Sequence, residues 1–355
     1  MTETQPAFVG GETLASPSPK LTTSEAEKLA RDLYGIECRA HMLTAERDQN
    51  LLLEVDGCSR FVMKISNPGE VRAVTDFQTA ALCHVECSDR HLPVPRIRRT
   101  LSGATEAPIV LADGRQSVTR VVTFLPGRPL VAAPGSARQR ANLARCLARL
   151  DRALQGFSHP GQGHYLQWDI THLDRLEPLL PNIKDPIGRE LLEGVLEEFH
   201  DRVQPAFGEL RRQVIYNDLN FYNVLVDEAD PDHITGIIDF GDIVAAPLVN
   251  DVAVAASYQF GSAGDRGAVA DFVAAYHAAL PLTVSEVAIL PALIAARLAT
   301  TVLITSYRAQ CYPQNSLYIL RNASAAWTAL KVLRAPEWHQ DGGWLKDALM
   351  DKERL

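Results

Sequence analysis

The sequence predicts an α+β fold of two lobes, a small antiparallel-sheet N-lobe followed by a larger, mostly helical C-lobe. The length of 355 residues exceeds one ordinary domain and suits two lobes that share a cleft. Short apolar runs separated by turn residues occur in the first third of the chain, whereas helical periodicity rich in Ala, Leu and Val fills most of the remainder. We therefore expect a flexible tail at 1–20, the N-lobe at 21–125 and the C-lobe at 126–355.

Composition and charge narrow the class of protein. Hydrophobic residues make up 46% of the chain and charged residues 22%, which is typical of a soluble globular protein. The 35 basic and 43 acidic residues give a net charge of −8, so we expect no nucleic-acid partner and no binding to anionic lipid. The same acidity weakly favours a cationic acceptor, such as an amine.

Targeting signals and cysteine usage favour the cytoplasm. The first twenty residues lack the basic start and apolar centre of a signal peptide, and no run of about 18 apolar residues suggests a membrane span. The 6 cysteines are scattered along a long chain and are expected to be reduced thiols. We expect a cytoplasmic protein without membrane contact, either a monomer or a homodimer.

The N-lobe begins with a helix and three strands. Ser24 and Glu27 have the spacing of a capping box, and Gly35 ends the helix. Asp56-Gly57 is a strong hairpin signal between the second and third strands. We expect these strands at about 37–43, 50–55 and 59–65.

Further elements follow in order. A helix is expected at 71–86, a strand begins at Leu92–Pro95, and another at 119–125 is broken by Pro126-Gly127, the expected hinge between the lobes. A long amphipathic helix at 137–154 carries leucines at helical spacing. The remaining helices are expected at 186–203 and, in several pieces, from 252 to 332.

The chemistry is concentrated in the segment Val214–Asp242. Apolar, β-branched runs flank the polar loop 217–223, and a third run ends at Asp239, which predicts strand, loop, strand, turn and strand. Phosphoryl transfer requires one carboxylate beside the acceptor hydroxyl, and a second carboxylate with an amide oxygen to hold Mg²⁺. We expect Asp218 in the first role, and Asn223 and Asp239 in the second.

An ordinary turn is the alternative interpretation of these residues. Asp and Asn are common at strand ends, and each residue taken singly would fit that explanation. Their joint spacing, with apolar strands around them, favours the catalytic interpretation.

The same residues carry a family resemblance. The order D-x-x-x-x-N followed by D-F-G matches the protein-kinase-like fold, and Y-N-D-L-N-F-Y-N with I-I-D-F-G-D resembles the aminoglycoside phosphotransferase and choline kinase superfamily. That superfamily usually has His-Gly before the base, where this chain has Tyr216-Asn217. The stretch 152–160 with Gln167-Trp168-Asp169-Ile170 is similar to hydroxylysine kinases and to kinase domains fused to certain aminotransferases.

The resemblance implies how a nucleotide is bound. Lys64, between apolar neighbours on its strand, resembles the lysine that pairs with the α- and β-phosphates, although a lysine there often faces solvent. Its partner is left open between Asp76 and Gln78, with Glu70 and Glu86 at the ends of the helix. The polar turn that covers the phosphates would contribute Arg47, Gln49 and Asn50, and the backbone of Thr123, Phe124 and Leu125 would receive the purine.

The resemblance also implies residues around the acceptor. Asp251 would brace the catalytic loop through its backbone amides, although a plain helix cap is the alternative. The candidates for contact with the acceptor are Asp242, Trp168, Asp169, Arg297 and Tyr307. For Trp168 and Asp169, packing is the alternative to substrate contact, and packing is favoured. A buried Arg297 would receive a substrate carboxylate, whereas a snorkelling surface arginine is equally consistent with the sequence.

The expected activity is that of a small-molecule kinase. We expect transfer of the γ-phosphate of ATP or GTP, with Mg²⁺, directly to a hydroxyl of an amino acid or amino alcohol. One alternative is an O-phosphotransferase for aminoglycoside or peptide antibiotics, which would favour more acidic residues in the last hundred residues than the sequence has. A second is a degenerate kinase that binds ligand without catalysis, an idea supported only by Tyr216-Asn217 and by the unassigned partner of Lys64.

Overall fold

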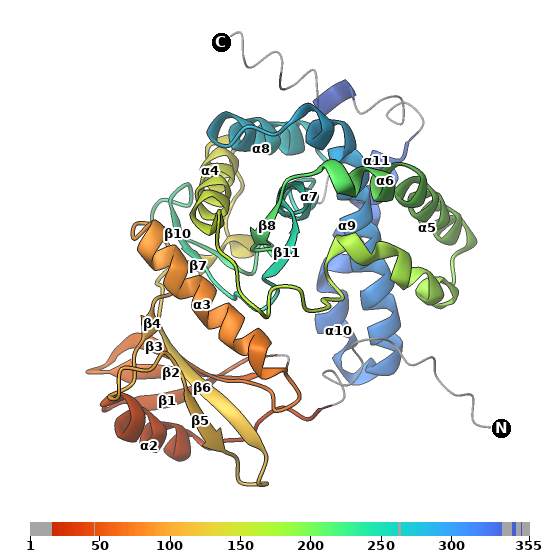
Figure 1. Cartoon of the computed structure of the whole chain (residues 1–355). Helices are drawn as coiled ribbons and strands as arrows, with labels where there is room; N and C mark the ends of the chain where they lie inside the picture. Colours follow the sequence, from red (N-terminus) through yellow and green to blue (C-terminus); the bar gives the residue numbers. More distant parts are fainter. Residues whose placement is uncertain (1–15, 46, 262–263, 336–342, 346–348, 350–355) are drawn as a thin grey trace, which may run out of the picture. The chain divides into compact units, whose positions relative to one another are not determined.

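The computed structural model describes residues 16–45, 47–261, 264–335, 343–345 and 349 (Figure 1). The chain separates into two units. One runs to Pro126 and includes His159–Tyr165, and the other comprises Gly127–Ser158 and the chain from Leu166 onward. The first unit contains a six-stranded sheet and the second is mostly helical, which confirms the α+β class.

The antiparallel sheet of the first unit has the order β1-β2-β3-β6-β4, with β5 paired to β6. The β2–β3 hairpin closes at Asp56 and Gly57, whose φ angles of +50° and +72° fit the predicted two-residue turn. Figure 1 shows α2 on one face of the sheet and α3 on the other. The elements are α2 (Thr23–Tyr34), β1 (Arg39–Leu43), β2 (Gln49–Val55), β3 (Cys58–Ile65), α3 (Arg72–Ser88), β4 (Ile97–Arg98), β5 (Ala107–Val110) and β6 (Gln116–Thr123).

The sheet face toward α2 forms the apolar core of this unit, with Leu51, Leu53, Met63 and Ile65 packed against the helix. The predicted capping box is wrong, because Thr22 caps α2 and Glu25 completes the box. Leu21 precedes the cap and packs in the same core as Ala26, four residues into the helix. This apolar pair on either side of the cap fixes the earlier start.

The strand predicted to begin at Leu92–Pro95 begins later, as β4 at Ile97. Backbone bonding to β6 begins at Arg96, whose carbonyl accepts from Thr123, and the strand pairing itself involves Ile97 and Arg98. Pro93 and Pro95 have no backbone N–H to donate to a neighbouring strand. The chain therefore pairs only after the second proline.

The segment His159–Tyr165 packs on α3, although it follows the helix 137–154 in sequence. The His159 Nε2 atom lies 3.2 Å from a carboxylate oxygen of Asp76, and its ring stacks on Phe77 with centroids 5.6 Å apart. Gly161 allows the backbones to approach closely, since a Cβ there would lie 2.2 Å from the carbonyl oxygen of Ala73. The first unit is therefore built from two separate stretches of the chain.

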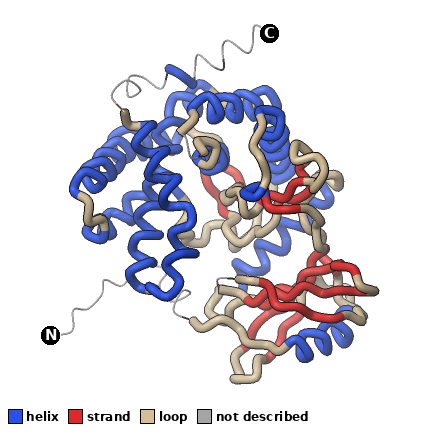
Figure 2. Tube along the Cα trace, turned by 180° about the vertical axis from the view of Figure 1, so that it is seen from behind, coloured by secondary structure: helices blue, strands red, loops and turns tan. Residues whose placement is uncertain are grey.

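The second unit combines two small sheets with helices (Figure 2). The sheets have the orders β10-β9-β7 and β11-β8, and the predicted strand, loop, strand, turn, strand segment is confirmed. The strands are β7 (Arg128–Pro129), β8 (Arg212–Ile215), β9 (Val224–Val226), β10 (Ile234–Ile237) and β11 (Val244–Pro247). The longer helices are α4 (Ala137–Leu154), α5 (Pro186–Glu198), α7 (Leu248–Ser257), α8 (Arg266–Ala279), α9 (Val284–Cys311) and α11 (Ala323–Leu333).

Short helical turns connect these helices. The predicted helix 186–203 consists of α5 followed by a π-helical turn at Phe199–Val203. The other short segments are η1 (Leu130–Ala132), η2 (Ile170–Asn182), α6 (Gln204–Ala206), η4 (Phe207–Glu209), η5 (Pro313–Asn315), α10 (Ser316–Ile319) and η6 (Leu320–Asn322).

The helix α9 is long and apolar enough to cross a membrane by length and composition alone. The expectation that no such run exists was therefore wrong. Of its most apolar 18-residue window, 83% is buried inside the protein, as in the core helix of a globular unit. Arg297 lies within this window and is only 2% exposed, so the helix carries a buried charge toward the interior.

The contact between His159–Tyr165 and α3 is testable with one pair of glycines. Gly161→Ala should destabilise the protein by about 1–3 kcal/mol, because the new methyl group meets the Ala73 carbonyl. Gly163→Ala is the matched control, since a Cβ there has no neighbour within 4 Å, and should change stability by less than about 0.5 kcal/mol. Urea unfolding measures both, and equal effects would contradict the close approach.

Candidate active site

The catalytic loop between β8 and β9 is anchored by a buried carboxylate on α7. The Asp251 carboxylate accepts hydrogen bonds from the backbone N–H groups of Tyr216 and Asn217, each at 2.8 Å. All three residues are fully buried. The carboxylate therefore replaces the strand partner that these two amides lose where the chain leaves β8.

Asn217 occupies the backbone conformation that explains the departure from His-Gly. Its φ of +65° lies in the left-handed region, which glycine adopts most easily and which asparagine tolerates better than most other residues. Both polar atoms of its side-chain amide are buried without a partner among the residues that the structure describes. Replacing glycine by asparagine thus keeps the turn and adds an unsatisfied buried amide.

Tyr216 joins the catalytic loop to the segment that follows β10. Its hydroxyl donates a hydrogen bond to the carbonyl oxygen of Ile238, and its ring packs edge to face on Phe240 with centroids 5.0 Å apart. Asp239 lies between these two contacts and has a left-handed φ of +60°. The tyrosine therefore holds the loop that carries Asp218 against the loop that carries Asp239.

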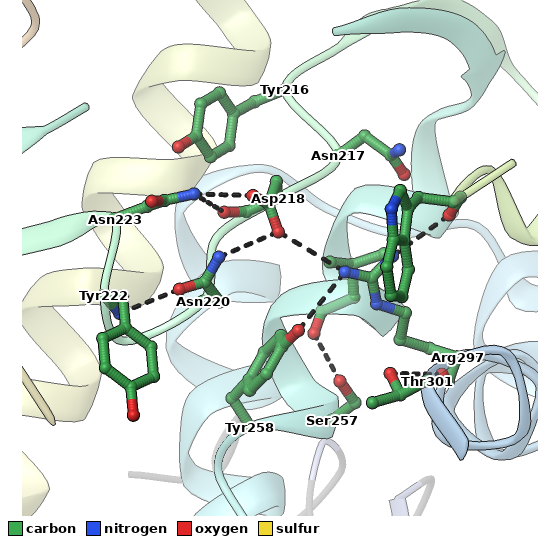
Figure 3. Close-up of polar contacts among 12 residues, drawn as sticks. Tyr216, Asn217, Asp218, Asn220, Tyr222, Asn223, Ser257, Tyr258, Arg297 and Thr301 are labelled. Carbon is green, nitrogen blue, oxygen red and sulfur yellow. Dashed lines mark hydrogen bonds and ion pairs between the residues drawn. The ribbon is translucent and has the colours of Figure 1, made fainter. Parts of the chain in front are cut away.

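The Asp218 carboxylate is the point at which the polar side chains converge (Figure 3). Asn223 Nδ2 donates to Asp218 Oδ2 at 2.6 Å, and Asn220 Nδ2 donates to Asp218 Oδ1 at 2.9 Å. Arg297 Nη2 donates to the same Oδ1, with 3.4 Å between nitrogen and oxygen. The side chain is still 19% exposed, so a substrate hydroxyl has access to it.

Negative charge accumulates around Asp218. Burial, and then the nearby carboxylates of Asp242 and Asp239, raise the pKa of Asp218 to about 8, against the opposing effect of Arg297. Carboxylates that repel one another in a partly dry site favour a cation between them. This charge distribution fits a divalent metal ion.

The donor set suits Mg²⁺ only in part. Because Asn223 donates its Nδ2 hydrogens to Asp218, its side-chain oxygen points away from that carboxylate, in the orientation that a metal ligand needs (Figure 3). Within the described ranges, no group of three or more His, Cys, Asp or Glu residues is gathered for a metal. Asn223 and Asp239 would therefore need phosphate oxygens and water to complete the coordination of Mg²⁺, which is how this ion is usually held.

Arg297 is a buried partner of the proposed base and not a surface arginine. Its side chain is 2% exposed, so the snorkelling alternative is wrong. Besides Asp218, it donates to the carbonyl oxygen of Trp168 at 3.0 Å and to the hydroxyl of Tyr258 at 3.3 Å. The ends of the guanidinium are thus already engaged, which leaves little of it for a substrate carboxylate.

Of the other residues predicted to contact the acceptor, some lie near Asp218 and Arg297 and others do not. The Trp168 ring lies 5.3 Å from the Arg297 guanidinium carbon, and Asp242 is close enough to raise the pKa of Asp218. Asp169 is 3% exposed and caps η2 through the Thr171 N–H at 2.9 Å, so its carboxylate has a structural partner. Tyr307 lies ten residues beyond Arg297, about 15 Å along the helix axis, and the structure does not bring it to Asp218.

The nucleotide candidates lie in the first unit. Lys64 pairs in register with Asn50 on β2 and Arg120 on β6, so the three side chains share the sheet face toward α3. Arg120 is 4% exposed and donates to Gln78 Oε1 at 2.7 Å, while Asp76 contacts His159. Gln78 and Asp76, the residues expected nearest to Lys64, are thus both engaged with other side chains.

The polar turn before β2 differs from the expectation at one residue. The Gln49 side chain pairs with the backbone of Leu21, accepting its N–H at 2.8 Å and donating to its carbonyl at 2.7 Å. It lies on the face toward α2 and does not serve as a phosphate donor. Arg47 approaches Glu70 at 3.8 Å, and Glu46 lies outside the described residues.

The backbone expected to receive a purine is partly occupied. The N–H groups of Thr123 and Phe124 donate to the carbonyls of Arg96 and Arg60, both at 2.9 Å. Among these three residues, Leu125 alone keeps an N–H without a partner in the described part of the chain. Purine binding at this backbone stays a prediction, with the Leu125 N–H as its remaining candidate donor.

A comparison with protein families decides the classification. The model of the phosphotransferase enzyme family matches residues 40–287, more than half of the chain. The chain belongs to the phosphotransferase enzyme family. The predicted resemblance is thereby confirmed, and the chain is a small-molecule kinase that transfers phosphate to an alcohol group.

Curated relatives and solved structures of this family agree. The chain is 26% identical to the hydroxylysine kinase of Mus musculus over 91% of its own length and 92% of the relative, and 25% identical to that of Bos taurus with the same coverage. An amicoumacin kinase with bound AMP-PNP and Ca²⁺ has the same fold, with a TM-score of 0.67, 15% identity and coverage of 92% of this chain and 97% of that one. A microcompartment-associated aminopropanol kinase also has this fold, with a TM-score of 0.59 and 18% identity. The match covers 87% of this chain and 100% of that one.

One part of this phosphotransferase site was missed by sequence reasoning. Asp151 on α4 is fully buried, accepts a hydrogen bond from the Tyr276 hydroxyl at 2.6 Å, and lies close enough to Asp251 to feel its charge. Burial, and then the charge of Asp251, raise the pKa of Asp151 well above its ordinary value. This shift favours the protonated, neutral form of Asp151 beside the carboxylate that anchors the catalytic loop. Its place among the leucines of α4 gave no signal beyond an acidic residue on an otherwise apolar face.

The substitution Asp151→Asn should preserve the stability of the protein. Because the pKa of Asp151 is raised in the folded state, this group binds more protons in the folded protein than in the unfolded chain, and its contribution to stability falls as pH rises above about 4. Asp151→Asn keeps an acceptor for Tyr276 and places a neutral side chain beside Asp251, but cannot ionise. Its stability relative to wild type should therefore increase between pH 4 and 8, as measured by thermal unfolding.

Asp151→Leu provides the contrast for that measurement. It leaves the hydroxyl of Tyr276 without its acceptor, and should cost about 1–3 kcal/mol at every pH. The other charged groups in the surroundings, Arg211 and its partner Glu286, are unchanged in both variants. An Asn variant as unstable as the Leu variant would contradict a neutral Asp151.

Proposed function

We propose that the chain transfers the γ-phosphate of ATP or GTP, with Mg²⁺, to the hydroxyl of an amino acid or amino alcohol of the hydroxylysine type. The observation that carries the proposal is the position of Asp218, a partly accessible carboxylate fixed between Asn223 and Arg297. The likeness to hydroxylysine kinases over 91% of the chain supports this acceptor class. The chemistry requires no phosphorylated enzyme, because direct in-line transfer suffices.

The residues present account for the protein's part in the reaction. Asp218 accepts a hydrogen bond from the acceptor hydroxyl and takes its proton as the oxygen attacks the γ-phosphorus and the bond to the β-phosphate oxygen breaks. Asn220, Asn223 and Arg297 hold the carboxylate in one orientation for that attack. Bound Mg²⁺ would supply positive charge to the phosphates, with Asn223 and Asp239 as its protein ligands.

The charge of the site favours an acceptor that carries an amine. With Mg²⁺ offsetting Asp239, the Asp242 carboxylate remains beside Asp218. An ammonium group of the acceptor would compensate this charge. Amino acids and amino alcohols of the hydroxylysine type carry such a group.

An acceptor screen tests the proposal. We expect release of ADP or GDP with 5-hydroxylysine or related amino alcohols, and none with lysine, which has the amine groups but no hydroxyl. Release only with aminoglycosides would place the activity with antibiotic phosphotransferases. Nucleotide binding without turnover on any acceptor would make the chain a degenerate kinase. Both results would overturn the proposed function, and parallel assays with ATP and GTP identify the preferred nucleotide.

Loss of the base should separate binding from chemistry. Asp218→Asn should lower kcat about 10²- to 10⁴-fold, the usual range for a general base, while nucleotide affinity measured by calorimetry changes little. Asp201→Asn is the matched control, because Asp201 is exposed on the π-helical turn after α5. If Asp218→Asn keeps wild-type turnover, another residue must accept the proton.

A further inference from the structure

The Arg321 guanidinium lies beside two tyrosine rings, one of which belongs to the catalytic loop. Its guanidinium carbon lies 3.8 Å from the ring centroid of Tyr318 on α10 and 4.8 Å from that of Tyr222 in the catalytic loop. One Nη1 hydrogen reaches the carbonyl oxygen of Tyr318 at 3.4 Å. In the part of the chain that the structure describes, Arg321 forms no ion pair, and its side chain is exposed.

The position of Tyr222 links Arg321 to the reacting groups. The Tyr222 N–H donates to Asn220 Oδ1 at 2.8 Å, and the amide nitrogen of the same Asn220 side chain donates to Asp218. Tyr222 also directly precedes Asn223, which contacts Asp218 at 2.6 Å. Figure 3 shows the Tyr222 ring pointing away from Tyr216. Arg321 and Asp218 belong to the same unit, so their relation is fixed within it.

An amino-acid acceptor presents a chemical requirement that Arg297 does not meet. Its α-carboxylate must find a cation when it enters a site that already contains Asp218, Asp239 and Asp242, or repulsion would exclude it. Arg297 is buried and committed to Asp218, Trp168 and Tyr258. The acceptor carboxylate therefore needs a second guanidinium on the accessible side of the catalytic loop.

The two tyrosine rings prepare Arg321 for this role. Stacking occupies the faces of a guanidinium and leaves its in-plane N–H groups, which match the two oxygens of a carboxylate. The rings also restrict the side chain, which lowers the entropy cost of binding. Exposed Leu317 on α10 and Leu320 at the start of η6 are close to Tyr318 in sequence, at 92% and 39% exposure. They offer apolar surface beside the charge for an aliphatic chain.

We propose that Arg321, stacked by Tyr222 and Tyr318, binds the α-carboxylate of the phosphate acceptor and makes the site selective for hydroxy amino acids over amino alcohols. The proposal rests on the proposed function and deepens it, because it decides between the two acceptor classes. No covalent step is involved. Arg321 sets acceptor affinity and leaves the proton transfer at Asp218 unchanged.

The test compares a hydroxy amino acid with the amino alcohol that lacks only its carboxylate, 5-hydroxylysine against 1,5-diaminopentan-2-ol. Arg321→Met should raise KM for 5-hydroxylysine about 10- to 100-fold, the range for losing a charged hydrogen-bonded pair, with a smaller change in kcat. KM for the diamino alcohol and for the nucleotide should change less than about twofold. Arg321→Lys should retain part of the affinity, because a lysine keeps the charge but not the bidentate geometry.

Two further variants complete the design. Tyr318→Ala removes one stacking ring. It should raise KM for 5-hydroxylysine and not for the diamino alcohol, but by less than Arg321→Met does. Arg145→Met removes an exposed arginine on α4 whose side chain contacts Asn142 of the same helix, and should leave all three KM values unchanged.

The outcomes separate this proposal from the proposed function. Equal losses for both acceptors in Arg321→Met would mean that the arginine only supports Tyr222, and would overturn the carboxylate site while the kinase activity stands. A rise in nucleotide KM alone would assign Arg321 to the phosphates and would also overturn it. If the wild-type protein phosphorylates no hydroxy amino acid, the proposed function and this site fail together.

Discussion

The conformation of the active site depends on one carboxylate that accepts two backbone amides. Where the chain leaves β8, Tyr216 and Asn217 turn through a left-handed residue and have no strand to pair with. A buried amide without an acceptor costs about 1–3 kcal/mol, so this turn is stable only because Asp251 satisfies both. Asp151 on α4 lies beside Asp251 and accepts a hydrogen bond from Tyr276 on α8. Four elements of the second unit thus converge on the position of a single loop.

The carboxylates of the active site destabilise the folded protein. Asp218, Asp239 and Asp242 repel one another, and Arg297 offsets that repulsion for Asp218 at the expense of burying a charge. A sequence selected for stability alone would remove at least one of these carboxylates. Their presence together is explained by a cation and a phosphate that occupy the site during the reaction, since both change the local balance of charge.

Much of the architecture could be predicted because it depends on patterns along the chain. The β2–β3 hairpin follows from Asp56-Gly57, the helix 137–154 from its leucine spacing, and the paired loops from apolar runs that end in Asp and Asn. The direction in which a side chain points was harder to predict from the sequence. Gln49 belonged to a polar turn in sequence but faces α2, because the strand alternation places it beside Leu51 and Leu53. Arg297 left two interpretations open, and only the packing of α9 against the catalytic loop distinguishes them.

The packing of His159–Tyr165 on α3 has a consequence for the evolution of the gene by recombination. A fragment that ends at Pro126 would lack the ring that stacks on Phe77 and the backbone that lies against Ala73. The gene segment that encodes the sheet therefore does not encode a complete structural unit. Recombination between homologous genes at this boundary would join a sheet to a foreign covering segment. Recombination that exchanges the first unit alone is therefore disfavoured. The coding sequences of the two units are expected to stay together during evolution.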